Sequence, residues 1–323
     1  MTLAQKLKDL EIDPPSQEIF SMSHGELRQR FSYLNGSVDS SRLIRNLIWQ
    51  DRLLLQAGLL EPVRGNIRSY WYARVKPVLG RARAKDFDDK YNLMISWLRD
   101  LVVDHQLISY SDFGFVDESA GQRKLGTDNA HIWCVAEKTG HLELLEQFHQ
   151  LYGVTIYALG GQPSALGSEN FVSMLRQAGL GKADCVMVSI VDFDPAGLSI
   201  IESFMHHLTR LGFEGQLRHI SLIHPAHLTE DQIKLNRYPL SRSNRQRTMN
   251  ADWAFRTGGL TAYGYSEHYG LEADAMSWQQ IEELFERQIT PYLTTPLEAL
   301  KRRRLDMELL QALKATLLRR LFG

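Results

Sequence analysis

Two aspartates follow an apolar run near the middle of the chain. The stretch VMVSIVDFDPAG, residues 186–197, ends a strand-like run with Asp192 and Asp194, one residue apart. Side chains two positions apart on an extended segment project to the same side, so both carboxylates are expected together at the carboxyl end of a strand. Carboxylates so close raise one another's pKa unless a cation neutralises them. The pair therefore predicts a binding site for a hard divalent ion, and we expect this ion to be Mg²⁺.

A third acid ends an earlier strand-like run. Glu137 stands in WCVAEKTG, where an apolar run again gives way to a charged residue. Because ligands bind at the carboxyl edge of a parallel sheet, Glu137, Asp192 and Asp194 can converge in one pocket. Simpler explanations stay open: Glu137 can be an exposed residue at a helix start, and an aspartate can cap the helix that begins at Pro195. Capping accounts for one aspartate and not for both.

The segments around these acids alternate between strand and helix patterns. From about residue 130, strand-like runs such as HIWCVAE, VTIYALGG, CVMVSIVDFD and RHISLIHP are separated by helical ones. This order predicts a parallel sheet with helices on its faces. The basic stretch 234–259 is too patternless for a simple turn and predicts a functional or mobile loop. The closing helix carries a stripe suited to core packing or dimerisation, of which we prefer packing, made of leucines 297, 300, 309, 313, 317 and 321.

The first 110 residues have a mainly helical pattern. Ser23 and Glu26 have capping-box spacing, and residues 40–60 repeat apolar residues at three and four. After two further helical segments, the short ISYSDFGFVDES suits a small β-wing. Helices followed by a wing are typical of a winged-helix module, a relative of the helix-turn-helix that often docks on DNA. The sequence thus predicts an α/β chain with a helical, winged-helix domain in residues 1–125 and a parallel-sheet domain with a C-terminal helical elaboration in residues 126–323.

Composition limits the possible partners and locations. The chain has 323 residues, 44% of them hydrophobic, which suffices for two domains with real cores. The net charge of -1 means that a polyanion must be met by a local basic patch. The two cysteines, Cys134 and Cys185, indicate neither a disulfide framework nor a zinc site. No run approaches the ~18 apolar residues of a membrane span, and the amino terminus lacks a signal-peptide core, so we expect a soluble, intracellular protein.

The acidic motifs resemble those of a known domain. A strand-end glutamate, then a strand-end Asp-x-Asp with glycine just beyond, resembles the Toprim domain of topoisomerases, primases and related nucleases, over the span from His131 to Pro225. More narrowly, YALGGQPS, DFDPAG and the later YGLEADAM resemble the A subunit of the type IIB DNA topoisomerases (topoisomerase VI) and its relative, the meiotic double-strand-break protein. The resemblance implies a winged-helix domain with a catalytic tyrosine, followed by a Toprim domain whose acids Glu137, Asp192 and Asp194 bind Mg²⁺.

The tyrosine motif of that family has a counterpart in RSYWY, residues 68–72. The resemblance implies that Tyr72 is the nucleophile, although tryptophan precedes it where the family more often has tyrosine or phenylalanine. Arg68, one helical turn earlier, lies on the same face and is expected to steady the phosphate. Tyr70 is the rival, but two residues along a helix turn through roughly 200°, so Tyr70 and Tyr72 face different directions. Without the downstream acids, such an aromatic run is typical of simple core packing.

The function implied by the resemblance is that of a DNA topoisomerase of the type IIB A-subunit kind. A homodimer cleaves double-stranded DNA through 5′-phosphotyrosyl bonds with Mg²⁺ as cofactor, and a separate ATPase B-type subunit drives strand passage. The expected location is the cytoplasm, with the nucleoid, in a prokaryote and the nucleus in a eukaryote. DNA is held through its phosphates, and the candidate contacts are Arg74, Lys76, Arg81, Arg83 and Lys85 after the tyrosine and Arg242, Arg245, Arg247 and Arg256 in the basic stretch.

Three alternatives to this function stay open. A Toprim nuclease would use the same acids with water as the nucleophile. A DNA-binding scaffold would have lost the metal and would retain only dimer and partner contacts. The motif DFDPAG also has a superficial likeness to the Asp-x-Asp of haloacid-dehalogenase phosphatases, which carry it on the first strand rather than on a later one.

Overall fold

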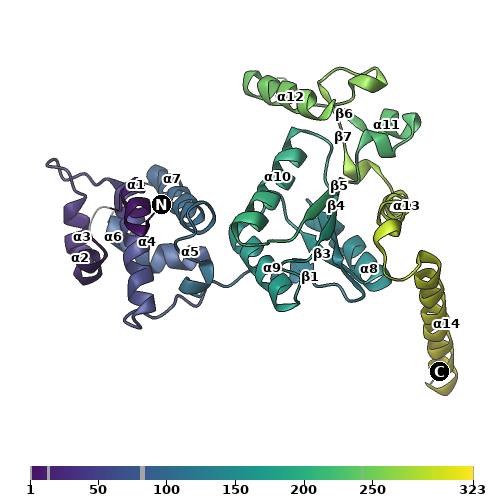
Figure 1. Ribbon diagram of the computed structural model, residues 1–323, viewed down its shortest axis with the longest axis horizontal. Helices are drawn as coiled ribbons and strands as arrows, with labels where there is room; N and C mark the ends of the chain where they lie inside the picture. The colour runs from purple at the N-terminus through teal and green to yellow at the C-terminus, as the bar shows by residue number, and fades with distance from the viewer. Residues whose placement is uncertain (1, 13–14, 81–83, 242, 323) are drawn as a thin grey trace. The chain divides into compact units, whose positions relative to one another are not determined.

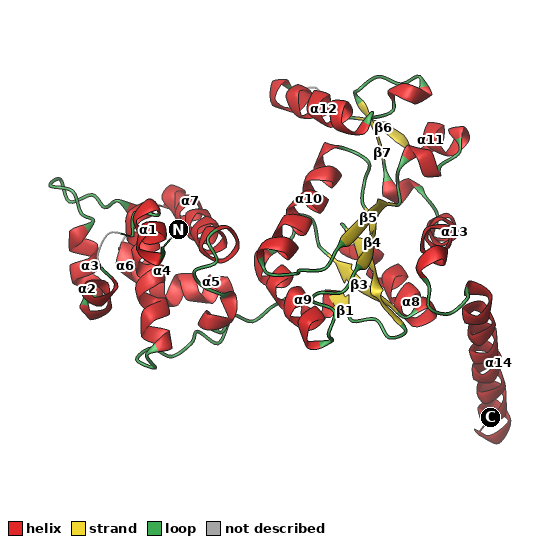
Figure 2. Cartoon of the chain, in the orientation of Figure 1, coloured by secondary structure: helices red, strands yellow, loops and turns green. Residues whose placement is uncertain are grey.

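The structure is a computed structural model that describes residues 2–12, 15–80, 84–241 and 243–322, and it leaves out the side chains at 84–87, 244–245, 307–308, 311–312 and 315–322. The chain divides into two compact units. Unit 1 comprises Met1–Glu118 with Ala165–Glu169, and unit 2 comprises Ser119–Ser164 with Asn170–Gly323. Figures 1 and 2 show helices in both units, whereas the strands gather in unit 2.

Unit 1 is built around one buried helix, α4 (Ser40–Gln56). Asp39 caps it by accepting a hydrogen bond from the backbone N–H of Arg42, and the residues from Leu43 to Asp51 are all buried. The predicted capping box of Ser23 and Glu26 is confirmed at the start of α3. The other helical segments of the unit are α1 (Leu3–Asp9), α2 (Ser16–Ser21), α3 (His24–Arg30), α5 (Ile67–Tyr70), the π-helix η1 (Trp71–Val75), α6 (Lys76–Leu79), α7 (Ala84–Arg99), the π-helix η2 (Asp100–Asp104) and the 3₁₀ helix η3 (Tyr110–Phe113).

The β-wing expected in ISYSDFGFVDES does not form, so that prediction is wrong. Tyr110–Phe113 is a 3₁₀ helix, and beyond it Phe115 makes a single bridge to Gly65. The reason is aromatic packing: the rings of Phe113 and Phe115 lie 5.4 and 5.7 Å from the ring of Tyr70. A 3₁₀ turn places residues three apart on one side, so Tyr110 and Phe113 are buried together, whereas a strand would turn them to opposite faces.

Unit 2 contains the predicted α/β sheet. Its strands are β1 (Arg123–Lys124), β2 (Asn129–Ala136), β3 (Val154–Ala158), β4 (Cys185–Ile190) and β5 (Leu217–Ser221), in the order β1-β3-β2-β4-β5. The neighbouring pairs β3–β2, β2–β4 and β4–β5 are parallel, and only β1 runs antiparallel. Ala136 of β2 lies level with Ala158 of β3 and Ile190 of β4. The chain therefore leaves these strands at the same edge of the sheet.

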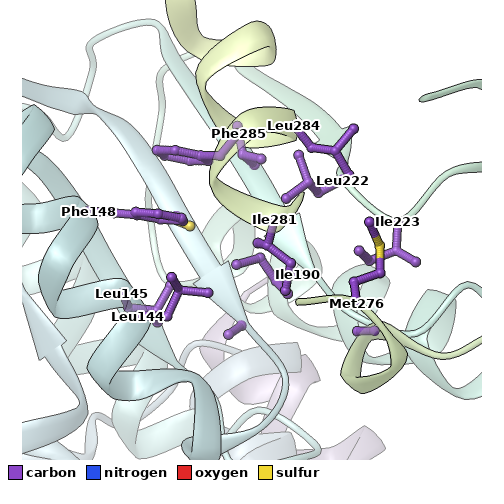
Figure 3. Packing of buried hydrophobic residues seen from close by; sticks show 14 of the residues in the cluster. Leu144, Leu145, Phe148, Ile190, Leu222, Ile223, Met276, Ile281, Leu284 and Phe285 are labelled. Atoms are coloured by element: carbon purple, nitrogen blue, oxygen red, sulfur yellow. The ribbon is translucent and has the colours of Figure 1, made fainter. Parts of the chain in front are cut away.

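Helices cover both faces of this sheet, as the alternation predicted. On one face α8 (Leu142–Tyr152) and α13 (Trp278–Ile289) pack against Val188 and Ile190, and on the other α9 (Ala165–Gln177) and α10 (Pro195–Arg210) pack against Cys185 and Met187. Figure 3 shows the first of these cores, in which the side chains of α13 meet those of α8 beside β4. Both cysteines are buried and free.

The stretch 234–259, expected as a loop, is largely ordered, so that expectation is wrong. It contains the end of α11 (Glu230–Asn236), the strand β6 (Arg237–Pro239) and the helix α12 (Asn244–Thr257). The strand β6 pairs antiparallel with β7 (Tyr269–Leu271), and Trp253 of α12 is buried with its ring 5.1 Å from that of Phe193. A pairing partner and an aromatic anchor, both distant in sequence, thus order a stretch that has no pattern of its own.

Among the described side chains of the closing helix α14 (Leu297–Phe322), those at its start pack against the core. Leu300 is buried and Leu297 contacts the same core, but Leu309 and Leu313 are 61% and 59% exposed. The preferred assignment of the whole stripe to core packing is therefore wrong for Leu309 and Leu313, and the side chains of Leu317 and Leu321 lie outside the described residues. Over the described part of the chain, α14 and the other helices are too short or too polar to cross a membrane.

The core in Figure 3 gives a direct test of packing. Phe285 of α13 is fully buried and stacks on Phe148 of α8 with ring centroids 4.4 Å apart. Replacing Phe285 by alanine is expected to lower the free energy of unfolding of unit 2 by about 3–5 kcal/mol, measured by urea denaturation. Phe255→Ala is the matched control, since Phe255 of α12 is 90% exposed and its loss should change little. A small effect at Phe285 would contradict the packing described.

A partly buried polar pair bridges two strands of the sheet. The side chains of Ser189 on β4 and His219 on β5 are linked by a hydrogen bond of 2.8 Å between Oγ and Nε2. Burial lowers the pKa of His219 to about 4. This pKa lies below the ordinary value near 6.5. Between about pH 4 and pH 6.5, His219 therefore binds a proton in the unfolded chain but not in the folded protein. The neutral imidazole therefore stabilises the fold above about pH 6.5, and this contribution is lost as the pH falls toward 4.

His219→Gln should weaken the acid sensitivity of folding. The amide can still reach Ser189 but does not titrate, so the melting temperature should fall less between pH 6.5 and pH 4 than in the wild type. Thermal unfolding at stepped pH measures the difference. His206→Gln, at an exposed position of α10, should retain the wild-type dependence. Identical profiles for His219→Gln and the wild type would contradict this account.

Candidate functional site

The three acids predicted from the sequence lie at the carboxyl edge of the sheet, close enough for the charges of the two aspartates to act on Glu137. Glu137 directly follows β2, and its backbone N–H donates to the carbonyl of Ile190 at the end of β4, 3.1 Å away. Burial raises the pKa of Glu137, and the negative charges of Asp192 and Asp194 raise it further, against smaller opposing effects of Lys138 and of the Asp192 backbone. The structure therefore brings Glu137, Asp192 and Asp194 together electrostatically.

Glu137 has an oxygen without a protein partner. Its Oε2 atom is buried and, among the described residues, makes no hydrogen bond. A buried carboxylate oxygen left unpaired costs free energy, and two further carboxylates nearby increase that cost. A cation next to Oε2 would relieve both effects.

Asp194 caps the helix that follows it, as the simpler explanation proposed. Its Oδ1 accepts a hydrogen bond from the backbone N–H of Gly197 at 2.6 Å, and Pro195 occupies the first turn of α10. Its Oδ2 accepts from the hydroxyl of Tyr238 on β6, also at 2.6 Å. A Cβ at Gly197 would lie 2.1 Å from the carbonyl oxygen of Asp192, so only glycine fits the close turn that holds the two aspartates.

Asp192 is held differently and is not a cap. Its Oδ1 accepts from the backbone N–H of Ala273 at 2.8 Å, and its Oδ2 lies 3.3 Å from Nζ of Lys138. The side chain is 13% exposed. Capping thus accounts for Asp194, whereas Asp192 faces a cation of the protein itself.

Two further acids at this edge were missed from the sequence. Nζ of Lys138 lies 2.6 Å from Oε1 of Glu272 and 2.8 Å from Oδ2 of Asp274, and Nε2 of His141 lies 3.1 Å from the other oxygen of Asp274. Phe193 and Leu271 exchange two backbone hydrogen bonds, and this bridge carries β7 and the acids after it to the Asp-x-Asp turn. The signal was present in YGLEADAM, where two acids one residue apart follow a short apolar run, as in DFDPAG.

We name the acid edge as the following set: Glu137, Asp192, Asp194, Glu272 and Asp274, with Lys138. Within it, burial lowers the pKa of Lys138, but its hydrogen bonds to Asp274 and Glu272 and the charge of Asp192 outweigh that effect and hold the pKa above its ordinary value. The Lys138 hydrogen bond is also the main reason that the pKa of Asp274 is lowered. Lys138 is therefore a firmly charged ammonium among the carboxylates.

The donor set at the acid edge fits Mg²⁺. Among the described residues, no three histidine, cysteine, aspartate or glutamate side chains are grouped as a ready enclosure for a metal. Mg²⁺ does not need one, because it usually keeps several waters and is bound through one or two carboxylates together with substrate phosphates. The unpaired oxygen of Glu137, with Asp192 and Asp194 beside it, matches that mode of binding.

The two tyrosines of RSYWY have opposite environments in unit 1. Tyr70 is 1% exposed, and its hydroxyl donates to Oδ2 of the buried Asp51 at 2.9 Å. Burial, and next the charge of Asp51, raise the pKa of Tyr70 well above its ordinary value, which makes a poor nucleophile. Tyr72 is 46% exposed. The predicted difference in direction is confirmed, and Tyr72 is the tyrosine that a ligand of unit 1 can reach.

A π-helical turn carries Tyr72. Trp71–Val75 is π-helical, and the backbone N–H of Lys76 bonds to the carbonyl of Trp71, five residues back. Pro77 follows in the first turn of α6. Proline has no N–H and its ring clashes with the carbonyl four residues earlier, so the wider turn is the expected local response. Trp71 is buried, and the ammonium of Lys76 lies 4.9 Å from the ring centroid of Tyr72.

Arg68 lies near Tyr72, as expected from the spacing. It is exposed on α5. Burial raises the pKa of Tyr91; the charge of Arg68 lowers it, and Glu118 and Tyr72 raise it by smaller amounts. The charges of Arg68 and Tyr72 therefore both act on Tyr91, whose ring packs edge-on against Trp71 with centroids 5.8 Å apart. Lys76 is held over Tyr72 and also belongs to this surface.

Arg74 does not belong to the surface around Tyr72. Its Nε and Nη2 atoms lie 3.2 and 2.6 Å from the two oxygens of Asp51, and the side chain is 20% exposed. Arg74 neutralises the buried Asp51, which also accepts from Tyr70, so the structure gives this guanidinium a partner inside unit 1, and its contact with DNA stays a prediction.

The remaining basic candidates fall into three groups. Arg247 is exposed on α12, and Arg256 forms an ion pair with Glu202 of α10. The residues Arg81, Arg83 and Arg242 lie outside the described residues, and no side chain is described at Lys85 or Arg245. Of the basic stretch, Arg247 thus stays a candidate contact, while Arg256 is used within unit 2.

A comparison with protein-family models finds no match for the chain, and a comparison with curated proteins finds no significant similarity. The resemblance in the acidic and tyrosine motifs therefore rests on the sequence motifs alone and stays a prediction.

Glu137→Gln tests the electrostatic strain at the acid edge. The pKa of Glu137 is raised in the folded protein, so its ionised form is disfavoured there, and at neutral pH a neutral amide should raise the melting temperature in the absence of divalent ions. Addition of Mg²⁺ should stabilise the wild type and stabilise the variant much less. Thermal unfolding with and without Mg²⁺ measures both effects, and Glu143→Gln on the exposed face of α8 is the control. A lower metal-free melting temperature in Glu137→Gln would refute this interpretation.

Proposed function

We propose that this chain is a Mg²⁺-dependent DNA-cleaving enzyme of the type IIB topoisomerase A-subunit kind. The observation that carries the proposal is the convergence of Glu137 with Asp192 and Asp194 at the ends of β2 and β4, with one buried glutamate oxygen left unpaired. The exposure of Tyr72, beside Arg68 in unit 1, supports the same chemistry. The fold supports only the coarser class, an α/β protein with a mainly parallel sheet.

The reaction is a transesterification. The phenol oxygen of Tyr72 attacks a DNA phosphorus, a bond forms between the tyrosine and the 5′ phosphate, and the bond to the 3′ oxygen breaks, leaving a 3′ hydroxyl after proton uptake. A phenol has a pKa near 10, so positive charge close to the attacking oxygen is needed at neutral pH. Arg68 supplies it and holds the phosphate. Because the phosphodiester energy is conserved in the tyrosyl bond, the break can be resealed.

The acid edge provides the second half of the chemistry. Glu137, Asp192 and Asp194 would hold Mg²⁺, and the bound ion would orient the scissile phosphate and offset charge on the departing oxygen. The chain itself contributes the strand ends that fix the carboxylates and the Gly197 turn that keeps the aspartates close.

The proposed assembly is a homodimer on double-stranded DNA. One chain offers one Tyr72 and one acid edge, so cutting both strands requires two chains related by two-fold symmetry. The sequence has no Walker or dinucleotide fingerprint, so we propose a separate ATPase subunit for strand passage. Such an enzyme acts where chromosomal DNA lies, with the nucleoid of a prokaryote or in the nucleus of a eukaryote.

Covalent trapping of DNA tests this function. The wild type, incubated with supercoiled plasmid and Mg²⁺ and then denatured, should carry DNA that moves with the protein; an ATPase encoded beside it is added in a parallel reaction. Tyr72→Phe should abolish the adduct, at least a hundred-fold, because it removes the attacking oxygen. Tyr70→Phe is the matched control, since it deletes a hydroxyl two residues away that is bound to Asp51 and should retain adduct formation.

Other outcomes of the trapping experiment separate the alternatives. Plasmid cleavage by Tyr72→Phe, with free 5′ phosphates and no adduct in either protein, would replace the proposal by a nuclease that uses water. DNA binding without cleavage by any variant would favour a scaffold.

A further inference from the structure

Lys138 occupies an unusual position at the acid edge. It is the residue directly after Glu137, and its ammonium lies within 3.3 Å of carboxylate oxygens from three residues in two segments. These oxygens belong to Asp192 after β4 and to Glu272 and Asp274 after β7. Three carboxylates thus contact one ammonium, and His141 is the next basic group, bound to Asp274.

The contacts of Lys138 are unequal. Glu272 and Asp274 lie 2.6 and 2.8 Å from Nζ, within hydrogen-bond distance, whereas Oδ2 of Asp192 lies at 3.3 Å. An ammonium has three N–H donors, so the two short contacts leave one donor for Asp192. The two acids that bind Lys138 most closely are outside the predicted metal set, while the third is inside it. Lys138 therefore makes its two short contacts with Glu272 and Asp274, and its contact with Asp192 is the longest of the three.

We propose that the ammonium of Lys138 competes with the divalent ion for Asp192. Glu272 and Asp274 set the strength of this competition, because their hydrogen bonds hold the ammonium away from Asp192. The inference rests on the proposed metal site and adds to it a residue that controls its affinity. Without metal, Lys138 neutralises Asp192 and keeps the acid edge folded. When metal binds, Asp192 is released from the longest of the three contacts, and Lys138 stays with Glu272 and Asp274.

The competition predicts opposite effects for two sets of substitutions. Lys138→Met removes the competing cation, so divalent ions should bind more tightly while the metal-free protein becomes less stable through repulsion among the carboxylates. Glu272→Gln with Asp274→Asn releases the anchors, so Lys138 should pair more fully with Asp192 and metal should bind more weakly. A lysine that merely packs at the surface would give neither effect.

Isothermal titration of the full chain with Mn²⁺ and Mg²⁺, without DNA, measures these affinities. Lys138→Met should bind the ion about five-fold or more tighter than the wild type. The Glu272→Gln, Asp274→Asn protein should bind it several-fold more weakly. When Lys138→Met is added to that protein, the effect of losing the anchors should largely disappear, because the anchors act through Lys138. Lys124→Met, which breaks an exposed pair with Glu146 of 2.6 Å, is the matched control.

The thermal stability of the Lys138 variants gives a second measurement of the same competition. Thermal unfolding should show a lower metal-free melting temperature for Lys138→Met and a larger gain on adding Mn²⁺ than in the wild type. Lys138→Gln, which removes the charge but keeps a hydrogen-bond donor for Glu272, replaces it if Lys138→Met does not fold.

The outcomes separate this inference from the proposed function. If the wild type binds the ion and Lys138→Met and Lys138→Gln bind it no more tightly, Lys138 is not a competitor, while the proposed metal site stands. If the anchors weaken binding equally with and without Lys138, they act by their own charge and the inference is overturned. If the wild type binds no divalent ion with or without DNA, the metal site fails and this inference fails with it.

Discussion

Carboxylates gathered at one edge of a sheet repel one another unless positive charge lies among them, and this constraint organises unit 2. The level ends of β2 and β4 bring Glu137 toward Asp192 and Asp194, and the bridge between Phe193 and Leu271 adds the acids that follow β7. Lys138 offsets this charge at three of the carboxylates. Within the described part of the chain, the buried Oε2 of Glu137 has no hydrogen-bond partner, and a divalent cation would satisfy it. The helices on both faces of the sheet fix the strand ends from which these side chains project.

In unit 1, one of two neighbouring tyrosines is buried and the other is exposed: Tyr70 lies in the interior and Tyr72 at the surface. Asp51, fully buried in α4, takes the hydroxyl of Tyr70 and the guanidinium of Arg74, so these two side chains stabilise the interior. The π-helical turn imposed before Pro77 then leaves Tyr72 exposed with Lys76 over its ring. A buried acid thus fixes which phenol is available, and π-helical turns are often found at functional sites.

The sequence predicted those structural features that depend on the spacing of nearby residues. The alternation of strand and helix, the acids at strand ends and the different directions of Tyr70 and Tyr72 follow from side-chain periodicity, and the structure has all three. The β-wing and the exposed part of the α14 stripe were mispredicted, because the aromatic cluster around Tyr70 and the absence of a described core beside Leu309 are tertiary facts. Glu272 and Asp274 were missed because β7 reaches the Asp-x-Asp turn across about 80 residues of chain, a pairing that no short-range signal encodes.

A crystal structure of the full chain with Mn²⁺, located by its anomalous scattering, tests the central claim most directly. The account predicts an ion bound to Glu137, Asp192 and Asp194, with the ammonium of Lys138 withdrawn from Asp192 and still bound to Glu272 and Asp274. An acid edge without an ion at saturating Mn²⁺, with Lys138 still in contact with Asp192, would contradict it.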